Sequence, residues 1–247
     1  MTCVVITGAS RGIGRATALL AAERGWSVLV NFRSDEAAAE ETASLVRKRG
    51  GRPLIWRADV TREDDVRAMF DAAAAEFGPV SAAVVNAGIV APASTLADMD
   101  IARLRRVFDV NVLGSYLCAR EAARRIPLSR GGPGGAIVIV SSMAARLGSP
   151  FEYVDYAGAK AALDTLTVGL AKELAADGVR VNAVRPGLIN TEIHASGGRP
   201  DRAQEMGAGS PIGRAGETSE VAEAIIWLLS ANASYVTGTI MDIAGGR

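Results

Sequence analysis

The stretch Cys3-Val4-Val5-Ile6-Thr7-Gly8-Ala9-Ser10-Arg11-Gly12-Ile13-Gly14 opens with a short apolar run and ends in three closely spaced glycines. The apolar run predicts a buried β-strand, and the apolar periodicity of residues 13–24 predicts a helix directly after it. Glycines at such a turn allow unusual dihedrals and close approach of a phosphate, and the N–H groups at the helix start favour negative charge. The stretch therefore predicts a site for the pyrophosphate of a dinucleotide. A tight strand–helix turn without a ligand is the alternative, because the Gly-x3-Gly-x-Gly spacing departs from the common G-x-G-x-x-G pattern.

The rest of the chain repeats this alternation of short β-branched runs and longer helical patterns. Strands are expected at residues 3–7, 27–32, 54–57, 82–85, 136–140, 179–184 and 239–242, and helices at 13–24, 34–49, 62–77, 100–125, 155–176 and 218–229. Strands that are apolar on both faces and joined by crossover helices indicate a parallel sheet covered on both sides. We therefore predict one doubly wound α/β domain spanning residues 1–247, with a seven-stranded, mostly parallel sheet and helices on both faces.

Two segments interrupt the alternation. Residues 129–135 (SRGGPGG) predict a turn, and residues 192–216, rich in Gly, Pro, Ser and Arg, predict a long loop or a short-helix insertion. Long loops in compact domains often close over a binding site, so we expect the second segment to be a substrate lid.

Composition narrows the class of partner. The 247 residues carry 27 basic and 27 acidic side chains, so no electrostatic attraction to nucleic acid or to a membrane surface is expected. Cys3 and Cys118 belong to no CxxC or Cys/His cluster, which disfavours a disulfide framework or a metal site. No apolar run reaches the length of a membrane span, and the first residues do not read as a signal peptide. We expect a cytoplasmic protein whose partners are neither nucleic acid nor a membrane.

A tyrosine and a lysine near the start of the 155–176 helix are the candidate chemical groups. Tyr156 and Lys160 are four residues apart, so they share a helix face, and a lysine charge beside a phenol is expected to lower the phenol pKa. In isolation such a pair is more often a packed aromatic with a solvated neighbour. Ser141 and Ser142 end the preceding strand, however, and ligands of open α/β sheets lie beyond the carboxyl ends of the strands.

Together these motifs resemble the short-chain dehydrogenase/reductase family over essentially the whole chain, which implies a Rossmann-type fold. The matching residues follow the family order: Gly8, Ser10, Arg11, Gly12, Ile13 and Gly14 in the cofactor loop, Asp59 and Val60 beside the adenine, Asn86, Ala87 and Gly88 after the fourth strand, Asn111 in a helix, Ser142, Tyr156 and Lys160 at the reaction centre, and Pro186, Gly187, Ile189 and Thr191 after the sixth strand. The interval from Ser142 to Tyr156 is about one residue longer than usual, which leaves Ser141 as an alternative to Ser142.

The resemblance implies a role for each of the central residues. Tyr156 would exchange a proton with the substrate oxygen, Ser142 would orient that oxygen, and Lys160 would hold the ribose hydroxyls of the cofactor. Asn111 would anchor a water leading from Lys160 to solvent. The nicotinamide would lie against Pro186, Gly187 and Ile189, with Thr191 on its carboxamide. The hydride chemistry itself belongs to the cofactor.

The end of the second predicted strand bears on the choice of cofactor. It reads Val30-Asn31-Phe32-Arg33-Ser34, without the carboxylate that NAD-selective sites use for the ribose 2′-hydroxyl. A guanidinium and a hydroxyl suit a 2′-phosphate instead, and Arg11 offers a second charge. We expect Asn31, Arg33 and Ser34 to bind NADP(H), with NAD(H) as the alternative.

The expected function is interconversion of a carbonyl and an alcohol, and the residues leave the substrate open. A broad carbonyl reductase, a 3-oxoacyl-carrier-protein reductase and a sugar dehydrogenase such as glucose 1-dehydrogenase all fit, and a non-catalytic nucleotide-binding or redox-sensing protein is the alternative from another class. Small residues at 157, 158, 161 and 162 and the apolar run 240–244 predict a homotetramer, because they allow close helix approach and disfavour a bare sheet edge.

Overall fold

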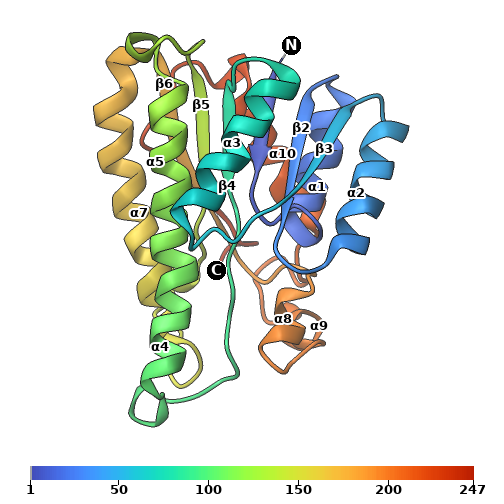
Figure 1. Ribbon diagram of the computed structural model, residues 1–247. Coiled ribbons are helices and arrows are strands. Elements are labelled where there is room, and N and C mark those ends of the chain that lie inside the picture. The colour runs from blue at the N-terminus through green and yellow to red at the C-terminus, as the bar shows by residue number, and fades with distance from the viewer. Residues whose placement is uncertain (1) are drawn as a thin grey trace.

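Seven parallel strands form one sheet in the computed structural model, which describes residues 2–247 (Figure 1). The strands are β1 (Cys3–Ile6), β2 (Ser27–Phe32), β3 (Arg52–Arg57), β4 (Ala82–Val85), β5 (Gly135–Val140), β6 (Val179–Pro186) and β7 (Ile240–Ile243). They lie in the order β3-β2-β1-β4-β5-β6-β7, and all six neighbouring pairs are parallel. The predicted single doubly wound domain is confirmed, and the sheet is parallel throughout.

Helices cover both faces of this sheet because alternate strand residues point to opposite sides. Val5 of β1 packs towards α3 (Glu63–Phe77), α5 (Ser115–Arg125) and α7 (Val154–Leu174). Its neighbour Val4 packs towards α1 (Gly12–Glu23), α2 (Glu36–Lys48) and α10 (Thr218–Leu229). The two apolar cores on either side of the sheet are built almost entirely from Ala, Val, Ile and Leu.

The helix predicted for residues 100–125 is divided. It consists of α4 (Ile101–Phe108), a wide π-helical turn (Asp109–Gly114) and α5. A Cβ on Gly114 would lie 2.8 Å from Val60 Cγ2, so the chain passes close over the loop that follows β3. A π-helical turn inside a helix often occurs at a functional site, and this one carries Asn111.

The position of the site follows from the strand order. The chain moves outward from β1 to β3 on one side and from β4 to β7 on the other, so a crevice opens beyond the carboxyl ends of β1 and β4. The predicted lid segment 192–216 follows β6 and contains α8 (Ile193–Ser196) and α9 (Arg202–Gly207), while α6 (Ala144–Leu147) follows β5. Within residues 2–247, no helix is long and apolar enough to cross a membrane.

Candidate active site

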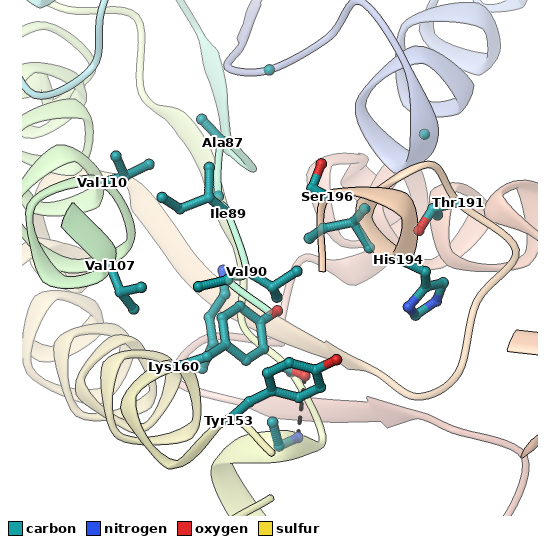
Figure 2. A pocket seen from close by; sticks show the side chains of 18 of the residues that line it. Ala87, Ile89, Val90, Val107, Val110, Tyr153, Lys160, Thr191, His194 and Ser196 are labelled. Carbon is teal, nitrogen blue, oxygen red and sulfur yellow. Dashed lines mark hydrogen bonds between the residues drawn. The ribbon is translucent and has the colours of Figure 1, made fainter. Parts of the chain in front are cut away.

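A cleft of about 990 Å³ lies at this crevice, between the glycine turn after β1, the ends of β4, β5 and β6, and the segment after β6 (Figure 2). It brings together most of the residues that the sequence predicted for the site. Those lining it are Gly8, Ser10, Arg11, Gly12, Ile13, Asn31, Arg33, Ser34, Asp59, Val60, Asn86, Ala87, Gly88, Ser142, Tyr156, Lys160, Pro186, Gly187, Ile189 and Thr191.

The glycine turn presents the start of α1 to the cleft. Gly8 and Gly12 have positive φ, +63° and +56°, which a side chain would disfavour. No side chain caps the first residues of α1, and its first turn contains no acidic residue. The backbone N–H groups of that turn are therefore free to bind an anion, so the cradle fits the pyrophosphate of a dinucleotide.

Three of the predicted cofactor residues shape this turn. A Cβ on Gly14 would lie only 2.4 Å from the carbonyl oxygen of Gly8, so Gly14 lets α1 pack against the loop, and it does not line the cleft. Asn31 is buried, accepts a hydrogen bond from the Gly8 N–H at 3.0 Å and donates to the Ala58 carbonyl at 3.1 Å. Asn86 Nδ2 donates to the carbonyls of Thr7 (2.8 Å) and Gly8 (3.1 Å).

Thr7, which the sequence predicts only as the end of a strand, is a positioning residue. Its hydroxyl oxygen accepts hydrogen bonds from the backbone N–H groups of Asn86 (2.9 Å) and Ala87 (3.0 Å). The side chain thereby ties the end of β1 to the end of β4. The threonine in the run TGASRGIG is the signal that could have indicated this role.

The structure distinguishes the two serines after β5. Ser141 is buried and its hydroxyl donates to the carbonyl of Lys160 at 3.1 Å, so it joins β5 to α7. The hydroxyl of Ser142 faces that of Tyr156 and lowers its pKa, and Ser142 Oγ accepts a hydrogen bond from the Ala144 N–H at 3.1 Å. Ser142 is thus the serine that lies beside the tyrosine.

Burial dominates the electrostatics of Tyr156 and Lys160. It raises the pKa of Tyr156 to about 12, although the hydrogen bond with Ser142 lowers it in part. It lowers the pKa of Lys160 to about 8, and the charge of Asp164 opposes that shift. Lys160 Nζ donates to the Val140 carbonyl at 2.8 Å and lies 5.7 Å from the centroid of the Tyr156 ring. The expected lowering of the tyrosine pKa is therefore wrong, because burial of the phenol raises the pKa and the Lys160 ammonium faces a strand-end carbonyl and the ring.

Asn111 holds the chain after β4 against this pair. It is fully buried; its Nδ2 donates to the carbonyls of Ile89 (3.0 Å) and Val107 (2.9 Å), and its Oδ1 accepts from the Ile89 N–H at 3.1 Å. A Cβ on Gly88 would lie 2.7 Å from that Oδ1 and 3.3 Å from Lys160 Nζ. The side-chain amide of Asn111 thus makes all of these hydrogen bonds with main-chain groups. It thereby positions the segment around Gly88, which passes Lys160.

The ends of β2 and β3 meet at the opposite side of the cleft. Arg33 Nε lies 3.0 Å from Asp59 Oδ2, and the arginine side chain is 64% exposed. Partial burial opposes ionisation of Asp59, but hydrogen bonds from Thr61 and the charge of Arg33 outweigh it and hold the Asp59 pKa below its usual range. Asp35 accepts a hydrogen bond from the Ala38 N–H at 3.0 Å, which caps α2. The end of β2 therefore presents the Arg33 guanidinium to a ligand. The carboxylates of Asp35 and Asp59 are already bound to groups of the protein itself.

The part of the cleft beyond Tyr156 is largely apolar. Its walls include Val90, Val107, Met143, Leu147, Tyr153 and Leu188. No sequence motif marks these apolar side chains, because exposure of an apolar side chain to a cavity depends on the tertiary fold. His194 Nε2 is 2.9 Å from the Ile189 carbonyl, and burial lowers the His194 pKa, so this histidine is neutral near pH 7.

A glycine cradle at a helix start and a Ser-Tyr-Lys set in one crevice define a nucleotide-dependent oxidoreductase. Comparison with known proteins gives the same class. Residues 8–247 match the family model described as enoyl-(acyl carrier protein) reductase. An uncharacterised oxidoreductase of Escherichia coli, YgfF, is 51% identical over 100% of both chains. A cis-4-hydroxycyclohexanecarboxylate dehydrogenase of Sinomonas cyclohexanicum is 44% identical, covering 98% of this chain and 94% of that one.

Solved structures agree with these sequence matches. A short-chain type dehydrogenase/reductase from Mycobacterium marinum superposes with a TM-score of 0.92 at 38% identity, over 99% of this chain and 94% of that one. The acetoin dehydrogenase YohF of Salmonella typhimurium gives a TM-score of 0.87 at 34% identity, over 100% of this chain and 97% of that one. The chain belongs to the short-chain dehydrogenase/reductase family, whose dehydrogenases use NAD(P)(H) and act on alcohol or carbonyl groups.

Proposed function

We propose that the protein is an NADP(H)-dependent oxidoreductase that interconverts a small-molecule carbonyl and an alcohol, with Tyr156 as the general acid/base. The observation that carries the proposal is the placement of Ser142 and Lys160 beside Tyr156 in the same cleft. Two relatives that are named for their activities, the hydroxycyclohexanecarboxylate and acetoin dehydrogenases, are dehydrogenases of hydroxyl-bearing small molecules.

The protonation states suit carbonyl reduction. With a pKa of about 12, Tyr156 is a neutral phenol at neutral pH and can donate a proton to the substrate oxygen. Ser142 holds the same oxygen by a hydrogen bond and so orients the carbonyl. Lys160, with a pKa of about 8, is mostly cationic at pH 7 and can hold the ribose hydroxyls while its charge favours the phenolate left after proton transfer. NADP(H), when bound, supplies or accepts the hydride.

The remaining predicted residues have binding or positioning roles in this proposal. The N–H groups at the start of α1 would bind the pyrophosphate, and Pro186, Gly187, Ile189 and Thr191 would flank the nicotinamide. Asn111, rather than leading a water through its amide, would keep the Gly88 segment in contact with Lys160. The lid would be the segment 192–216.

The preference for NADP(H) rests on the end of β2. Arg33 is the exposed cation there, and its partner Asp59 lies on the neighbouring strand end, where it holds the guanidinium at the cleft. Arg11 and Ser34 line the same part of the cleft and can add contacts to a 2′-phosphate.

The two cysteines are compatible with a reducing compartment, and we place the enzyme in the cytoplasm. Cys3 and Cys118 are free and buried, and burial raises their thiol pKa values to about 11 and about 12. Such thiols are poor nucleophiles and serve as packing groups.

Replacing Tyr156 by Phe tests the proposed function. The variant keeps the packed ring and loses only the hydroxyl, so turnover should fall by about 10²- to 10⁴-fold while the fold and cofactor affinity persist. Turnover is measured on an accepted carbonyl and cofactor affinity by fluorescence titration. Retention of a tenth of wild-type turnover would overturn the mechanism.

Three further variants separate the roles within the site. Lys160→Ala should lower both the rate and the cofactor affinity, because it removes a ribose contact and a charge beside the phenol. Ser142→Ala should lower the rate alone. Ser141→Ala is its matched control, and it should affect stability through the lost hydrogen bond to the Lys160 carbonyl, with a smaller effect on rate.

A further inference from the structure

Three segments meet beyond Tyr156, at the substrate end of the cleft. They are the chain after β4, the loop before α7, and the segment 192–216. A Cβ placed on Gly197 would lie 3.2 Å from Val90 Cγ2 and 3.3 Å from Tyr153 Oη, so the lid main chain is in contact with both other segments. Figure 2 shows Val90 and Tyr153 between Lys160 on one side and the lid residues His194 and Ser196 on the other.

Glu152 joins the lid to the loop before α7. Its carboxylate binds Arg199 Nη1 at 3.1 Å through Oε1 and Arg202 Nη2 through Oε2. The Arg202 guanidinium also lies 5.2 Å from the centroid of the Tyr153 ring, and the arginine side chain is only 14% exposed. One carboxylate therefore holds two lid cations, and we name this cluster of Glu152, Arg199 and Arg202 the ionic strap.

The backbone of Glu152 is itself fixed. Its carbonyl accepts hydrogen bonds from the Ser94 N–H at 3.0 Å and from Arg103 Nη2 at 3.4 Å. Arg103 in turn binds the buried carboxylate of Asp155 at 2.8 Å. The residue whose carboxylate binds the lid cations, Glu152, is therefore held in place by the chain after β4 and by α4, on the other side of the cleft.

The loop that carries Glu152 has an unusual conformation. Ser149 and Phe151 have φ of +43° and +65°, in the left-handed region that residues other than glycine rarely adopt. This loop lies between Ser142 and Tyr156. A strained turn therefore comes immediately before the residue whose carboxylate belongs to the strap.

We infer that the ionic strap closes the substrate end of the cleft and restricts the enzyme to small, free carbonyl compounds, excluding acyl chains bound as thioesters to a carrier protein or to coenzyme A. The inference rests on the proposed carbonyl–alcohol chemistry. While its carbonyl is held at Tyr156, an acyl chain linked to a carrier through a thioester must extend out of the cleft. It would pass between the loop before α7 and the lid, and the strap joins these two walls. A compact apolar substrate fits between Val90, Val107 and Met143 without such an exit.

The test compares Glu152→Gln with Glu205→Gln. Glu205 binds Arg199 at 2.8 Å, but both residues belong to the lid, so the control variant loses an ion pair that does not cross the cleft. For each protein, kcat/KM is measured with cyclohexanone, diacetyl and acetoacetyl-coenzyme A. Wild type and Glu205→Gln should strongly prefer the small ketones. Glu152→Gln should raise the ratio of thioester to ketone kcat/KM by about 10-fold, the effect of about 1.4 kcal/mol.

A second variant tests the closure without removing a charge. Gly197 has φ of −85°, which alanine adopts without strain, but the added methyl would press on Val90 and Tyr153. Gly197→Ala should therefore move the thioester-to-ketone ratio in the same direction as Glu152→Gln. Equal ratios in wild type and both variants would overturn the inference, as would a wild type that reduces the thioester as well as the ketones.

Proteolysis separates failure of the strap from failure of the proposed function. Arg202 is a trypsin site inside the strap, so Glu152→Gln should be cleaved there faster than Glu205→Gln whether or not the protein is an enzyme. Absence of activity on every carbonyl would overturn the proposed function, and with it the inferred substrate class. Equal cleavage rates in the two variants would show that Glu152 does not hold the lid, and would overturn the strap.

Discussion

At the scale of single residues, the sequence revealed the identity of the reacting groups better than their electrostatics. Tyr156 and Lys160 could be predicted because helical spacing alone puts them on one face. The direction in which the pKa of Tyr156 shifts could not be predicted, because it depends on burial and on where the lysine ammonium points. The Arg33–Asp59 pair likewise joins the ends of two strands, and no sequence pattern marks its geometry.

The buried Lys160 should make the stability of the cofactor-free protein depend on pH. Its pKa is about 8 in the folded protein against 10.5 for an ordinary lysine, so between these values the unfolded chain binds more protons and stability rises with pH. Below pH 8 Lys160 is charged in both the folded and the unfolded protein. Burial of this charge then lowers the free energy of unfolding by its full amount. Lys160→Met should therefore stabilise the protein at pH 7 by roughly 2–3 kcal/mol.

Urea unfolding of wild type and Lys160→Met at pH 7 and near pH 10.5 measures this difference. The advantage of the methionine variant should shrink at the higher pH, because wild-type Lys160 is then neutral when folded. A difference that stays constant between the two pH values would contradict the assignment of the shift to Lys160.

Arg33 tests the cofactor preference. Arg33→Ala should weaken NADPH binding by about 10- to 100-fold and NADH binding far less, because a hydrogen bond to a charged group contributes about 1.5–3 kcal/mol. Arg57→Ala is a suitable control, since Arg57 Nε donates to the Arg33 carbonyl at 3.1 Å and its side chain does not line the cleft. Affinities are measured by fluorescence titration. A wild type that prefers NADH would show that the end of β2 was misread.

At the scale of elements, the fold could be predicted because most strands are short apolar runs bounded by polar turns. The predicted strands and helices correspond to observed ones, with shifts of a few residues at their ends. The division of the 100–125 segment was not predicted, because the π-helical turn depends on the close approach of Gly114 to Val60. For residues 192–216 the short-helix alternative is confirmed by α8 and α9, but the bounds of these helices could not be predicted, because they are only four and six residues long.

At the scale of the whole molecule, two separate surfaces bear on the predicted homotetramer. One lies along α4, α5 and α7 at one side of the molecule (Figure 1), where Phe108, Leu113, Tyr116 and Val168 are exposed. The other is β7, the last strand of the sheet, which leaves an apolar edge. Two different self-complementary surfaces on one chain produce a closed tetramer with dihedral symmetry, whereas one alone would give a dimer.

The helix surface was predicted from four small residues of α7, and the structure divides them. Ala157 is buried within its own chain, while Gly158 is exposed and a Cβ on it would meet nothing within 4 Å. In an isolated chain Gly158→Ala should stabilise the helix by about 0.5–1 kcal/mol. Against a partner helix packed closely on Gly158, the added methyl should instead lower the melting temperature.

Light scattering of wild type, Gly158→Ala and Gly158→Leu decides between these cases. We expect a tetrameric wild type and, for the bulky leucine, assemblies of half that mass held together through β7, because only the helix surface is blocked. Leucine is a good helix former, so the isolated chain should tolerate it. A monomeric wild type at micromolar concentration, or a stabilised Gly158→Leu tetramer, would remove α7 from the interface and leave the exposed side chains of α4 and α5 without a partner.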